Sequence, residues 1–396
     1  MMANRLVLRT ATRPPSCLHH YIYSNEVAGR RQCRNLASLA SNDSGVNGSV
    51  NTAKKTPGSE NIIQSTTTNS NTLKSNSNPN EVNKFSSFAS HWWDSRSNPL
   101  VGMNPIRIKF LRDVVDTFQP SFSSIPTNTQ KNSTEQQKIQ HHQLPLHNKR
   151  ILDIGCGGGL LTESLSRLGA SLVVGVDAST HVVEVAKRHS FHENSRLVSS
   201  LQDNGGNLES SRDIRYIGGI TVEELASSWL AEYEKERQQQ ALSSSISAES
   251  SSSLQHELFD IVTALEIIEH VPNPSSLLQA AKSLLKPNGI LIVSTINRTV
   301  KSYGLAIIAA EYILGKVPVG THTWDMFWSP TEVEQMICSS SSSSHPMKNE
   351  SNGRTRMKQI ALSGMVLQPP FINMEWKLDG SDTDVNWIGA YQKQQV

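Results

Sequence analysis

Two carboxylates and one imidazole stand within five consecutive residues of the sequence, at Glu266, Glu269 and His270. They directly follow Phe259–Leu265, a largely apolar run that is typical of a buried strand. Carboxylate oxygens are ligands that Mg²⁺ prefers, and an imidazole can take a proton from a hydroxyl group. We expect a magnesium site made by all three side chains, with Glu266 and His270 as catalytic residues. The alternative is that His270 alone is the general base, while the glutamates orient it or cap the following helix.

A second polar site is predicted where a short apolar run meets a run of glycines. The apolar run Ile151–Ile154 predicts a strand. Residues 155–159 are all glycine except Cys156, and a helical pattern begins directly after them at Leu160. Without Cβ atoms, such a backbone lets a polar ligand approach the main-chain N–H groups and the helix N-terminus. The next predicted strand ends at Asp177, whose carboxylate would accept hydrogen bonds from both hydroxyls of a ribose. Together these features predict a site for a nucleoside cofactor.

The glycine spacing indicates which nucleoside cofactor the site would take. Dinucleotide sites carry G-x-G-x-x-G, whereas this turn has G-x-G-x-G followed by Leu160. Asp153, two residues before the turn, would repel a pyrophosphate but would favour the cationic amine of S-adenosylmethionine. We therefore expect S-adenosylmethionine as methyl donor. The alternatives are a nicotinamide-dependent reductase on the same kind of sheet and an ordinary strand-to-helix turn without a ligand.

Both predicted sites depend on a sheet that places strand ends together. Five apolar runs alternate with helical patterns, at residues 151–154, 171–177, 214–217, 259–265 and 290–294. This alternation is typical of an α/β fold with a parallel sheet. Ligands bind such sheets at the carboxyl ends of the strands, and each predicted site follows one of those ends.

Further segments, in matching order over roughly residues 83 to 393, carry a more specific pattern. They are Lys84–Trp93, Asn104–Arg107, Leu265–Pro272, Ser294–Arg298, Ala310–Leu314, Val317–His322 and Asp384–Trp387. This pattern resembles the ubiquinone-biosynthesis O-methyltransferases, which belong to the class I S-adenosylmethionine-dependent methyltransferases. The resemblance implies a Rossmann-like α/β fold with a seven-stranded, mostly parallel sheet, helices on both faces and an N-terminal helical cap. The chain departs from the family pattern in its polar insertions, at Leu265 and in the aromatic Trp324–Trp328.

The resemblance also implies an activity. The substrates would be polyprenylated catechols, namely polyprenyl-dihydroxybenzoate and demethylubiquinol. Cofactor contacts would fall at Arg107, Gly155, Asp177 and Leu265. Divalent-metal ligands would fall at Glu266, Glu269 and His270. The protein would be peripheral on the matrix side of the mitochondrial inner membrane, in a complex with other ubiquinone-biosynthesis proteins. A non-catalytic cofactor-binding scaffold and a methyltransferase for another small phenol are the alternatives.

The N-terminal region is rich in arginine and poor in acidic residues. Arg5, Arg9 and Arg13 recur at every fourth position, as on one face of a helix. This composition predicts a mitochondrial transit peptide, and the alternative is a disordered basic tail. The predicted domains are the transit peptide at 1–40, a disordered polar linker at 41–82 and the methyltransferase domain at 83–396. Low-complexity insertions are predicted near 119–148, 193–212, 236–256 and 338–355.

The composition argues against several other classes of protein. Lys and Arg total 37 against 35 Asp and Glu, and the predicted domain has no basic cluster, so we expect no nucleic-acid partner. The four cysteines lie far apart without C-x-x-C spacing, which indicates neither a zinc site nor a disulfide framework.

Two apolar segments outside the predicted sheet are notable. Around Trp92 and Trp93 aromatic residues cluster, and packing is the expected role of at least one of the two. An amphipathic helix is predicted at 104–115, with Pro105 in its first turn. Val300–Leu314 is apolar but too short to span a bilayer, so we expect a membrane-facing lid, with core packing as the alternative.

Overall fold

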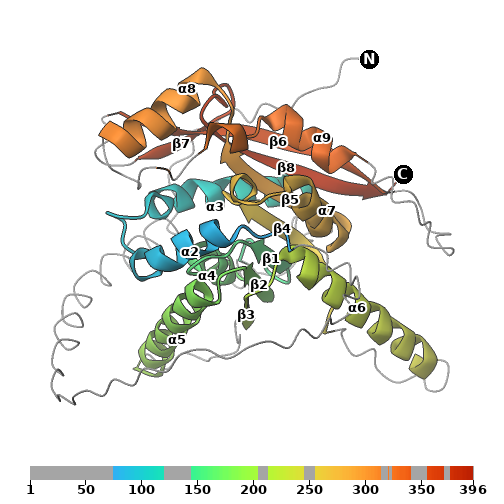
Figure 1. Ribbon diagram of the computed structural model, residues 1–396. Coiled ribbons are helices and arrows are strands. Elements are labelled where there is room, and N and C mark those ends of the chain that lie inside the picture. The colour runs from blue at the N-terminus through green and yellow to red at the C-terminus, as the bar shows by residue number, and fades with distance from the viewer. Residues whose placement is uncertain are drawn as a thin grey trace, which may run out of the picture. The chain divides into compact units, whose positions relative to one another are not determined.

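The computed structural model describes residues 75–119, 144–203, 213–244, 255–313, 320, 323–339, 355–369 and 375–395. Within these residues one sheet has the strand order β3-β2-β1-β4-β5-β8-β6-β7 (Figure 1). Its strands are β1 (Arg150–Ile154), β2 (Leu172–Asp177), β3 (Asp213–Gly218), β4 (Phe259–Leu265), β5 (Leu285–Ile296), β6 (Thr355–Leu367), β7 (Trp376–Asp379) and β8 (Asn386–Gln395). The predicted transit peptide lies outside the described residues.

The sheet has a parallel part and an antiparallel part. β1 to β5 pair with one another in parallel, whereas β8 runs antiparallel between β5 and β6. This confirms the predicted Rossmann-like fold of class I methyltransferases. The predicted count of seven strands is wrong by one, because the short strand β7 pairs with Gly364–Leu367 of β6 and makes an eighth.

Helices cover both faces of the sheet, as predicted. The helical elements are α2 (Pro79–Phe88), η1 (Ala89–His91), α3 (Pro99–Phe118), α4 (Leu160–Arg167), α5 (Thr180–Asp203), α6 (Val222–Ser244), η4 (Ile268–His270), α7 (Pro274–Ser283), α8 (Val300–Ser302), η5 (Tyr303–Ile313), η6 (Trp324–Met326) and α9 (Pro330–Cys338). Apolar side chains of α6, α7 and α9 share one core cluster, and those of α3 and α4 share another.

The alternation of side chains along the strands explains the two cores. In β1, Leu152 belongs to the cluster with α6, α7 and α9, whereas its neighbour Ile151 belongs to the cluster with α3 and α4. Ile292 and Val293 of β5 divide in the same way. Successive side chains of a strand point to opposite faces, so strands covered on both sides must be apolar throughout. This is why β1, β2, β4 and the second half of β5 were recognisable in the sequence as apolar runs.

The helix that follows the tryptophans starts earlier than predicted. The Asn98 side chain accepts a hydrogen bond from Leu100 N at 3.1 Å, and Pro99 occupies the first turn. Both are helix-start signals, so α3 begins there and not at residue 104. Pro105 consequently lies inside the helix, where its ring nitrogen cannot donate the usual backbone hydrogen bond.

The boundary of the predicted linker is also wrong. α2 begins at Pro79, because the Asn78 side chain caps it by accepting from Asn80 N at 3.0 Å. Asn76 is hydrogen-bonded to Glu223 and to the backbone of Asn273. The ordered domain therefore starts before residue 83.

Several predicted insertions contain ordered residues. α5 continues into the insertion predicted at 193–212, and α6 continues into that at 236–256. Leu146, within the insertion predicted at 119–148, is completely buried. Most of the insertion predicted at 338–355 lies outside the described residues.

Candidate functional site

The turn after β1 has a backbone that requires glycine. Gly155, Gly157 and Gly159 have φ values of 68°, 53° and 88°, in the left-handed region that side chains with a Cβ disfavour. The Asp177 carboxylate at the end of β2 braces this turn, since it accepts from Gly157 N at 3.0 Å and from Ser179 N at 2.8 Å. Burial raises the pKa of Asp177, while these two N–H donors oppose the rise.

The glycines also make room for a tryptophan. A Cβ atom on Gly157 or Gly158 would overlap the indole of Trp92, which is 8% exposed. Trp93 Nε1 donates a hydrogen bond to the carbonyl of Gly158 at 3.0 Å. The prediction that at least one tryptophan serves packing is confirmed. The glycine run thus has a second structural reason beyond ligand approach, because the N-terminal cap packs directly on it.

A cavity opens beside this turn, and we call it the glycine-turn cavity. Its walls include Gly155 after β1, Asp177 after β2, Thr221 after β3 and Ile267 after β4. The segment from Asn76 to Phe85 lines it from the N-terminal side. Carboxyl ends of four parallel strands therefore contribute to one cavity, as expected for a doubly wound sheet.

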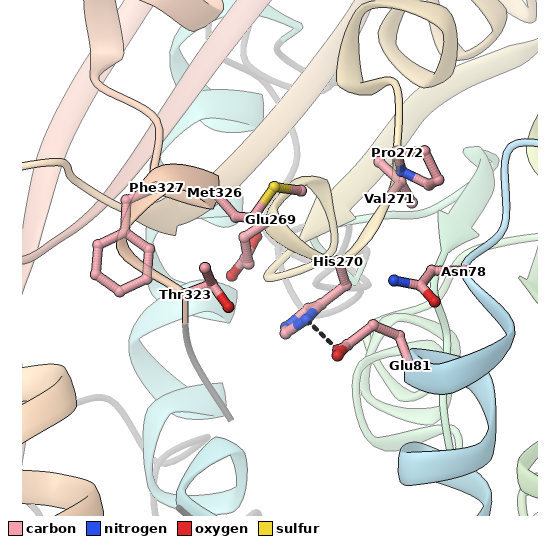
Figure 2. Close-up of a pocket in the computed structure, with 9 residues that line it drawn as sticks. All are labelled: Asn78, Glu81, Glu269, His270, Val271, Pro272, Thr323, Met326 and Phe327. Atoms are coloured by element: carbon pink, nitrogen blue, oxygen red, sulfur yellow. Dashed lines mark hydrogen bonds and ion pairs between the residues drawn. The ribbon is translucent and has the colours of Figure 1, made fainter. Parts of the chain in front are cut away.

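A second cavity, which we call the histidine cavity, has a volume of about 300 Å³. It is lined by Asn78, Glu81, Glu269, His270, Val271, Pro272, Thr323, Met326 and Phe327 (Figure 2). These residues come from three parts of the chain, namely α2, the end of β4 with η4, and the segment around η6. Its size is at the lower end of the range for small-molecule sites.

The two cavities share part of their walls. Asn78, Glu81, His270 and Val271 line both of them. A ligand beside the glycine turn and a ligand beside Thr323 would therefore both meet His270. This arrangement suits a reaction in which a group passes from one bound molecule to another.

His270 is held by the N-terminal helix. Its Nδ1 lies 2.8 Å from Glu81 Oε2, and its side chain is 11% exposed (Figure 2). The ring of Phe85 packs edge-on against the imidazole, with 4.9 Å between the ring centroids. The hydrogen bond from His270 is the main cause that lowers the pKa of Glu81. The pair therefore combines an ionised carboxylate with an imidazole that faces two cavities.

Glu266 is paired with a buried arginine. Its Oε1 lies 3.5 Å from Arg107 Nη2 and accepts from Ser294 Oγ at 2.7 Å. Glu266 has a φ of 52°, which is uncommon for a residue with a side chain and turns the backbone sharply after β4. Burial lowers the pKa of Arg107, and the nearby charge of Glu266 opposes this.

Comparison with known proteins fits this architecture. A family model described as "Methyltransferase domain" matches residues 117–338, which is more than half of the chain. The ubiquinone biosynthesis O-methyltransferase of Azorhizobium caulinodans is 35% identical over 78% of this chain and 91% of its own length. That of Idiomarina loihiensis is 32% identical over 83% of this chain and 99% of its own length. The chain belongs to this family. A mitochondrial member from Dictyostelium discoideum is 33% identical over 78% of this chain and 75% of its own length.

In this member of the methyltransferase family, each predicted magnesium ligand has a different partner, although Glu269 and His270 line the same cavity. Glu266 faces Arg107, Glu269 Oε2 accepts from Thr295 Oγ1 at 2.8 Å, and His270 faces Glu81. Burial raises the pKa of Glu269, which the nearby His270 opposes. Among the described residues, no group of three His, Cys, Asp or Glu side chains is arranged to hold a metal ion. As arranged here, these side chains do not fit a magnesium site.

The residues that the family resemblance assigns to the cofactor fall in two places. Gly155 and Asp177 line the glycine-turn cavity, whereas Arg107 and Leu265 lie deeper and line neither of the two cavities. Arg107 Nε is buried without a hydrogen-bond acceptor in the described part of the chain, and Nη2 has the Glu266 carboxylate 3.5 Å away. A buried guanidinium with an unused donor fits a carboxylate ligand, such as the amino-acid end of S-adenosylmethionine.

Asp153 has partners that the sequence did not suggest. Its carboxylate accepts from Thr162 Oγ1 at 2.6 Å and from Thr263 Oγ1 at 2.8 Å. Burial raises its pKa to about 6, and the two hydroxyl donors oppose the rise. Asp153 was expected to attract the amine of the cofactor. Its carboxylate is instead buried inside the sheet, where two threonine hydroxyls already bind it.

Sequence reasoning missed the N-terminal contribution to the site. Glu81 and Asn76 were assigned to the linker, although both line the glycine-turn cavity. A signal was present, because Asn78, Pro79 and Glu81 are the residue types expected at the cap, first and third positions of a helix.

Proposed function

We propose that this chain transfers a methyl group from S-adenosylmethionine to a phenolic hydroxyl of polyprenylated catechols in ubiquinone biosynthesis. The observation that supports this most is the wall shared by the two cavities, which places His270 against both. A methyl donor and its acceptor must be in contact during transfer, so adjacent sites are required. The activity for which the relatives are named agrees with this arrangement.

The donor would occupy the glycine-turn cavity. Asp177 would accept hydrogen bonds from the ribose hydroxyls in this cavity. Arg107 does not line the cavity, so the amino-acid end of the cofactor would extend beyond it for its carboxylate to accept a hydrogen bond from Arg107 Nε. Gly155 and Leu265 would contact the cofactor at the ends of β1 and β4. When bound, S-adenosylmethionine would supply an electrophilic methyl carbon, whose bond to the positively charged sulfur would break as its bond to the phenolate oxygen forms, leaving S-adenosylhomocysteine.

The acceptor would occupy the histidine cavity, whose apolar side chains Met326 and Phe327 face polar Thr323 and His270. A phenol with a pKa of about 10 is a poor nucleophile at neutral pH, so a base must remove its proton. We assign this role to His270, since its Nδ1 is occupied by Glu81 and its Nε2 is left to accept the proton. Glu266 would keep Arg107 in place as a positioning residue.

The sequence also predicted Mg²⁺ at Glu266, Glu269 and His270. Each of these side chains has its own hydrogen-bond partner here, and the proposed proton transfer to His270 requires no metal ion. The two assignments make opposite predictions for turnover after chelation of divalent metal.

We further propose peripheral membrane contact through Val300–Ile313. Val300, Tyr303, Leu305 and Ile308 are 86%, 44%, 46% and 44% exposed, which is unusual for neighbouring apolar side chains. No helix among the described residues is long and apolar enough to cross a membrane. A lipid-facing segment would let a polyprenylated substrate enter from the bilayer.

The mitochondrial location is proposed from the arginine-rich N-terminus and from the mitochondrial relative. We expect the matrix face of the inner membrane, in a complex with other proteins of the pathway. Sequencing the N-terminus of the protein isolated from mitochondria should find a start after residue 40. An intact Met1 on the imported protein would exclude a cleaved transit peptide.

Turnover is the decisive test of the enzyme assignment. The purified protein should convert polyprenyl-dihydroxybenzoate and demethylubiquinol analogues to their methyl ethers with S-adenosylmethionine, as detected by mass spectrometry. Cofactor binding without any methyl transfer would instead indicate the scaffold role. Methyl transfer to simple phenols, without transfer to the polyprenylated catechols, would indicate a methyltransferase that acts on another small phenol.

A further inference from the structure

We infer that the aromatic side chains of Tyr303, Trp324 and Phe327 guide the polyprenyl tail of the acceptor from the histidine cavity to the exposed apolar segment Val300–Ile313. We call these three residues the aromatic track. The inference rests on the proposed function, because it requires an acceptor whose catechol ring carries such a tail. The track sets the preference for tailed over tail-less catechols and takes no part in proton or methyl transfer.

The histidine cavity is too small for the whole acceptor. Its volume of about 300 Å³ is at the lower end of the range for sites that hold drug-sized molecules. A catechol ring is smaller than such a molecule, whereas a polyprenyl tail lengthens with every isoprene unit. Exposure of this hydrocarbon to water is unfavourable. The tail must therefore leave the cavity along another apolar surface.

The walls of the histidine cavity differ in polarity. On the side of α2, Asn78 caps the helix and the Glu81 carboxylate is hydrogen-bonded, so both present polar groups. The Val271–Pro272 wall is apolar, but its first residue also lines the glycine-turn cavity, which the donor would occupy. On the side of η6 the wall is made by Met326 and Phe327, which Figure 2 draws apart from the residues of α2. The η6 wall is therefore the one that suits a hydrocarbon tail.

Ring contacts connect the η6 wall to the surface of the protein. Phe327, which is completely buried, packs against Trp324 with 6.0 Å between the ring centroids. Trp324 in turn meets the ring of Tyr303 edge-on, with 5.4 Å between the centroids. Both distances are typical of aromatic rings in contact. Trp324 is partly exposed and Tyr303 is 44% exposed, so the aromatic track runs from the interior to the surface.

The outer end of the aromatic track lies in the segment proposed to meet the membrane. Tyr303 begins η5, and Leu305 and Ile308 of the same element are exposed apolar residues. A tail that leaves along Tyr303 therefore stays on apolar surface until it reaches lipid. The sequence distinguished Trp324–Trp328 as an aromatic departure from the family pattern, and the proposed function gives Trp324 no other role.

Hydrogen bonds fix both elements that carry the aromatic track. Trp328 N, after η6, donates to Ile296 O at the end of β5 at 3.1 Å. Thr299 Oγ1 donates to Asp384 O at 2.6 Å and caps α8, which leads directly into η5. The alternative is that the three rings only pack η5 against η6. Loss of a ring would then affect tailed and tail-less acceptors equally.

Two acceptors that differ only in their tail test the inference, namely dihydroxybenzoate with a farnesyl tail and the same ring without a tail. Methyl transfer to each is followed by mass spectrometry, and the wild type should have the lower KM for the farnesylated acceptor. Trp324→Ala should raise this KM roughly tenfold more than the KM for the tail-less acceptor, because an apolar contact with the tail is lost. Trp324→Phe keeps an aromatic ring and should restore most of the difference. Phe191→Ala, which removes an exposed ring on α5, is the control and should leave both KM values unchanged.

A proportional loss for both acceptors in Trp324→Ala would show a packing role and overturn the inference, as would an unchanged KM for the farnesylated acceptor. Tyr303→Ala is a second variant at the exposed end of the aromatic track, where truncation should leave the fold intact. It should shift the ratio of the two KM values in the same direction.

Photolabelling locates the tail without relying on turnover. A farnesyl tail with a photoreactive group at its end should label Trp324 or residues of Val300–Ile308, as found by peptide mass spectrometry. Labelling of α2 in their place would overturn the inference. Equal KM values for the two acceptors in an active wild type would also overturn it and leave the proposed function standing. A wild type that methylates neither acceptor would refute the proposed function itself.

Discussion

The two cavities of this protein are assembled in opposite ways. The glycine-turn cavity is braced by a contact between Gly157 and Asp177, which are 20 residues apart in the sequence. The histidine cavity depends on a contact between Glu81 and His270, which are 189 residues apart. The bracing contact of the first is therefore local to one strand–turn–strand unit, although α2 and the ends of other strands also line that cavity. The second needs the N-terminal helix, the centre of the sheet and the segment around η6 to come together.

This difference predicts different sensitivities for the two sites. Changes at the glycine-turn cavity should alter the affinity for the cofactor, since its groups hold a bound molecule in place. Changes at the histidine cavity should alter the rate of turnover, since its groups act on the reacting hydroxyl.

His270→Ala should lower kcat by roughly 10²- to 10⁴-fold, the usual contribution of a general base. The dissociation constant for S-adenosylmethionine should change little, because the proposed polar contacts of the cofactor, Asp177 and Arg107, lie on β2 and α3. Steady-state kinetics and calorimetry measure the two quantities. A comparable loss of cofactor affinity would mean that the two cavities are not functionally separate.

The buried Asp153 carboxyl should make stability depend on pH. Its pKa is about 6 in the folded state and 3.8 ordinarily, so the folded protein holds a proton that the unfolded chain releases. This contribution to stability is complete below about pH 4 and is lost as the pH rises through about 6. Relative to Asp153→Asn, the wild type should lose about 3 kcal/mol of unfolding free energy between pH 4 and pH 7. Denaturant titrations at both pH values check this, and parallel curves would contradict it.

Asp177→Ala should weaken S-adenosylmethionine binding by about 2 kcal/mol, or roughly 30-fold, since a charge-assisted acceptor is lost. Asp213→Ala is the matched control, because Asp213 begins β3 at the opposite end of the parallel strands. Calorimetry should find wild-type affinity in the control. Equal affinity in both variants would remove Asp177 from the cofactor site.

Ile307→Glu/Ile308→Glu should reduce flotation with anionic liposomes several-fold, because charged side chains oppose burial of an apolar face in the interface. Phe191→Glu is the control, since Phe191 is a 70% exposed apolar residue on α5. The control should float like the wild type. Unchanged flotation of the double variant would mean that Val300–Ile313 is not the membrane contact.

Removal of divalent metal should have the smallest effect. With His270 as the base, EDTA should leave turnover within about twofold of its starting value, because proton transfer to an imidazole needs no Lewis acid. Loss of turnover that Mg²⁺ restores would favour the magnesium site predicted from Glu266, Glu269 and His270.

The comparison of the two cavities also explains what the sequence could predict. Strands covered on both faces have continuous apolar runs, so β1, β2, β4 and β5 and their carboxyl ends were identified from residues such as Ile151 and Ile292. The glycine turn and Asp177 were found because their geometry is encoded within one strand–turn–strand unit. Family resemblance supplied the fold of the remaining part of the sheet.

Contacts between residues that lie far apart in the sequence could not be predicted from local patterns. Proximity of Glu266, Glu269 and His270 in the sequence suggested a shared ligand, but the turn after β4 sends the three side chains to Arg107, Thr295 and Glu81 respectively. The eighth strand was missed because β7 has only four residues and depends on pairing with β6. Predicted helix starts were wrong where the capping residue lay before the predicted range, as Asn98 does for α3.

The attachment of Asn76 has a consequence for the maturation of the protein. Its side chain joins Glu223 on α6 to the start of α7, five residues before Glu81. A processing protease can therefore cut the chain upstream of Asn76 without touching these bonds. A cut between Asn76 and Glu81 would remove the Asn76 bonds, although α2 would stay joined to η1, and a cut after Glu81 would remove the partner of His270. The hydrogen bonds of Asn76 therefore limit how far downstream the mature N-terminus can lie without loss of contacts in the folded enzyme.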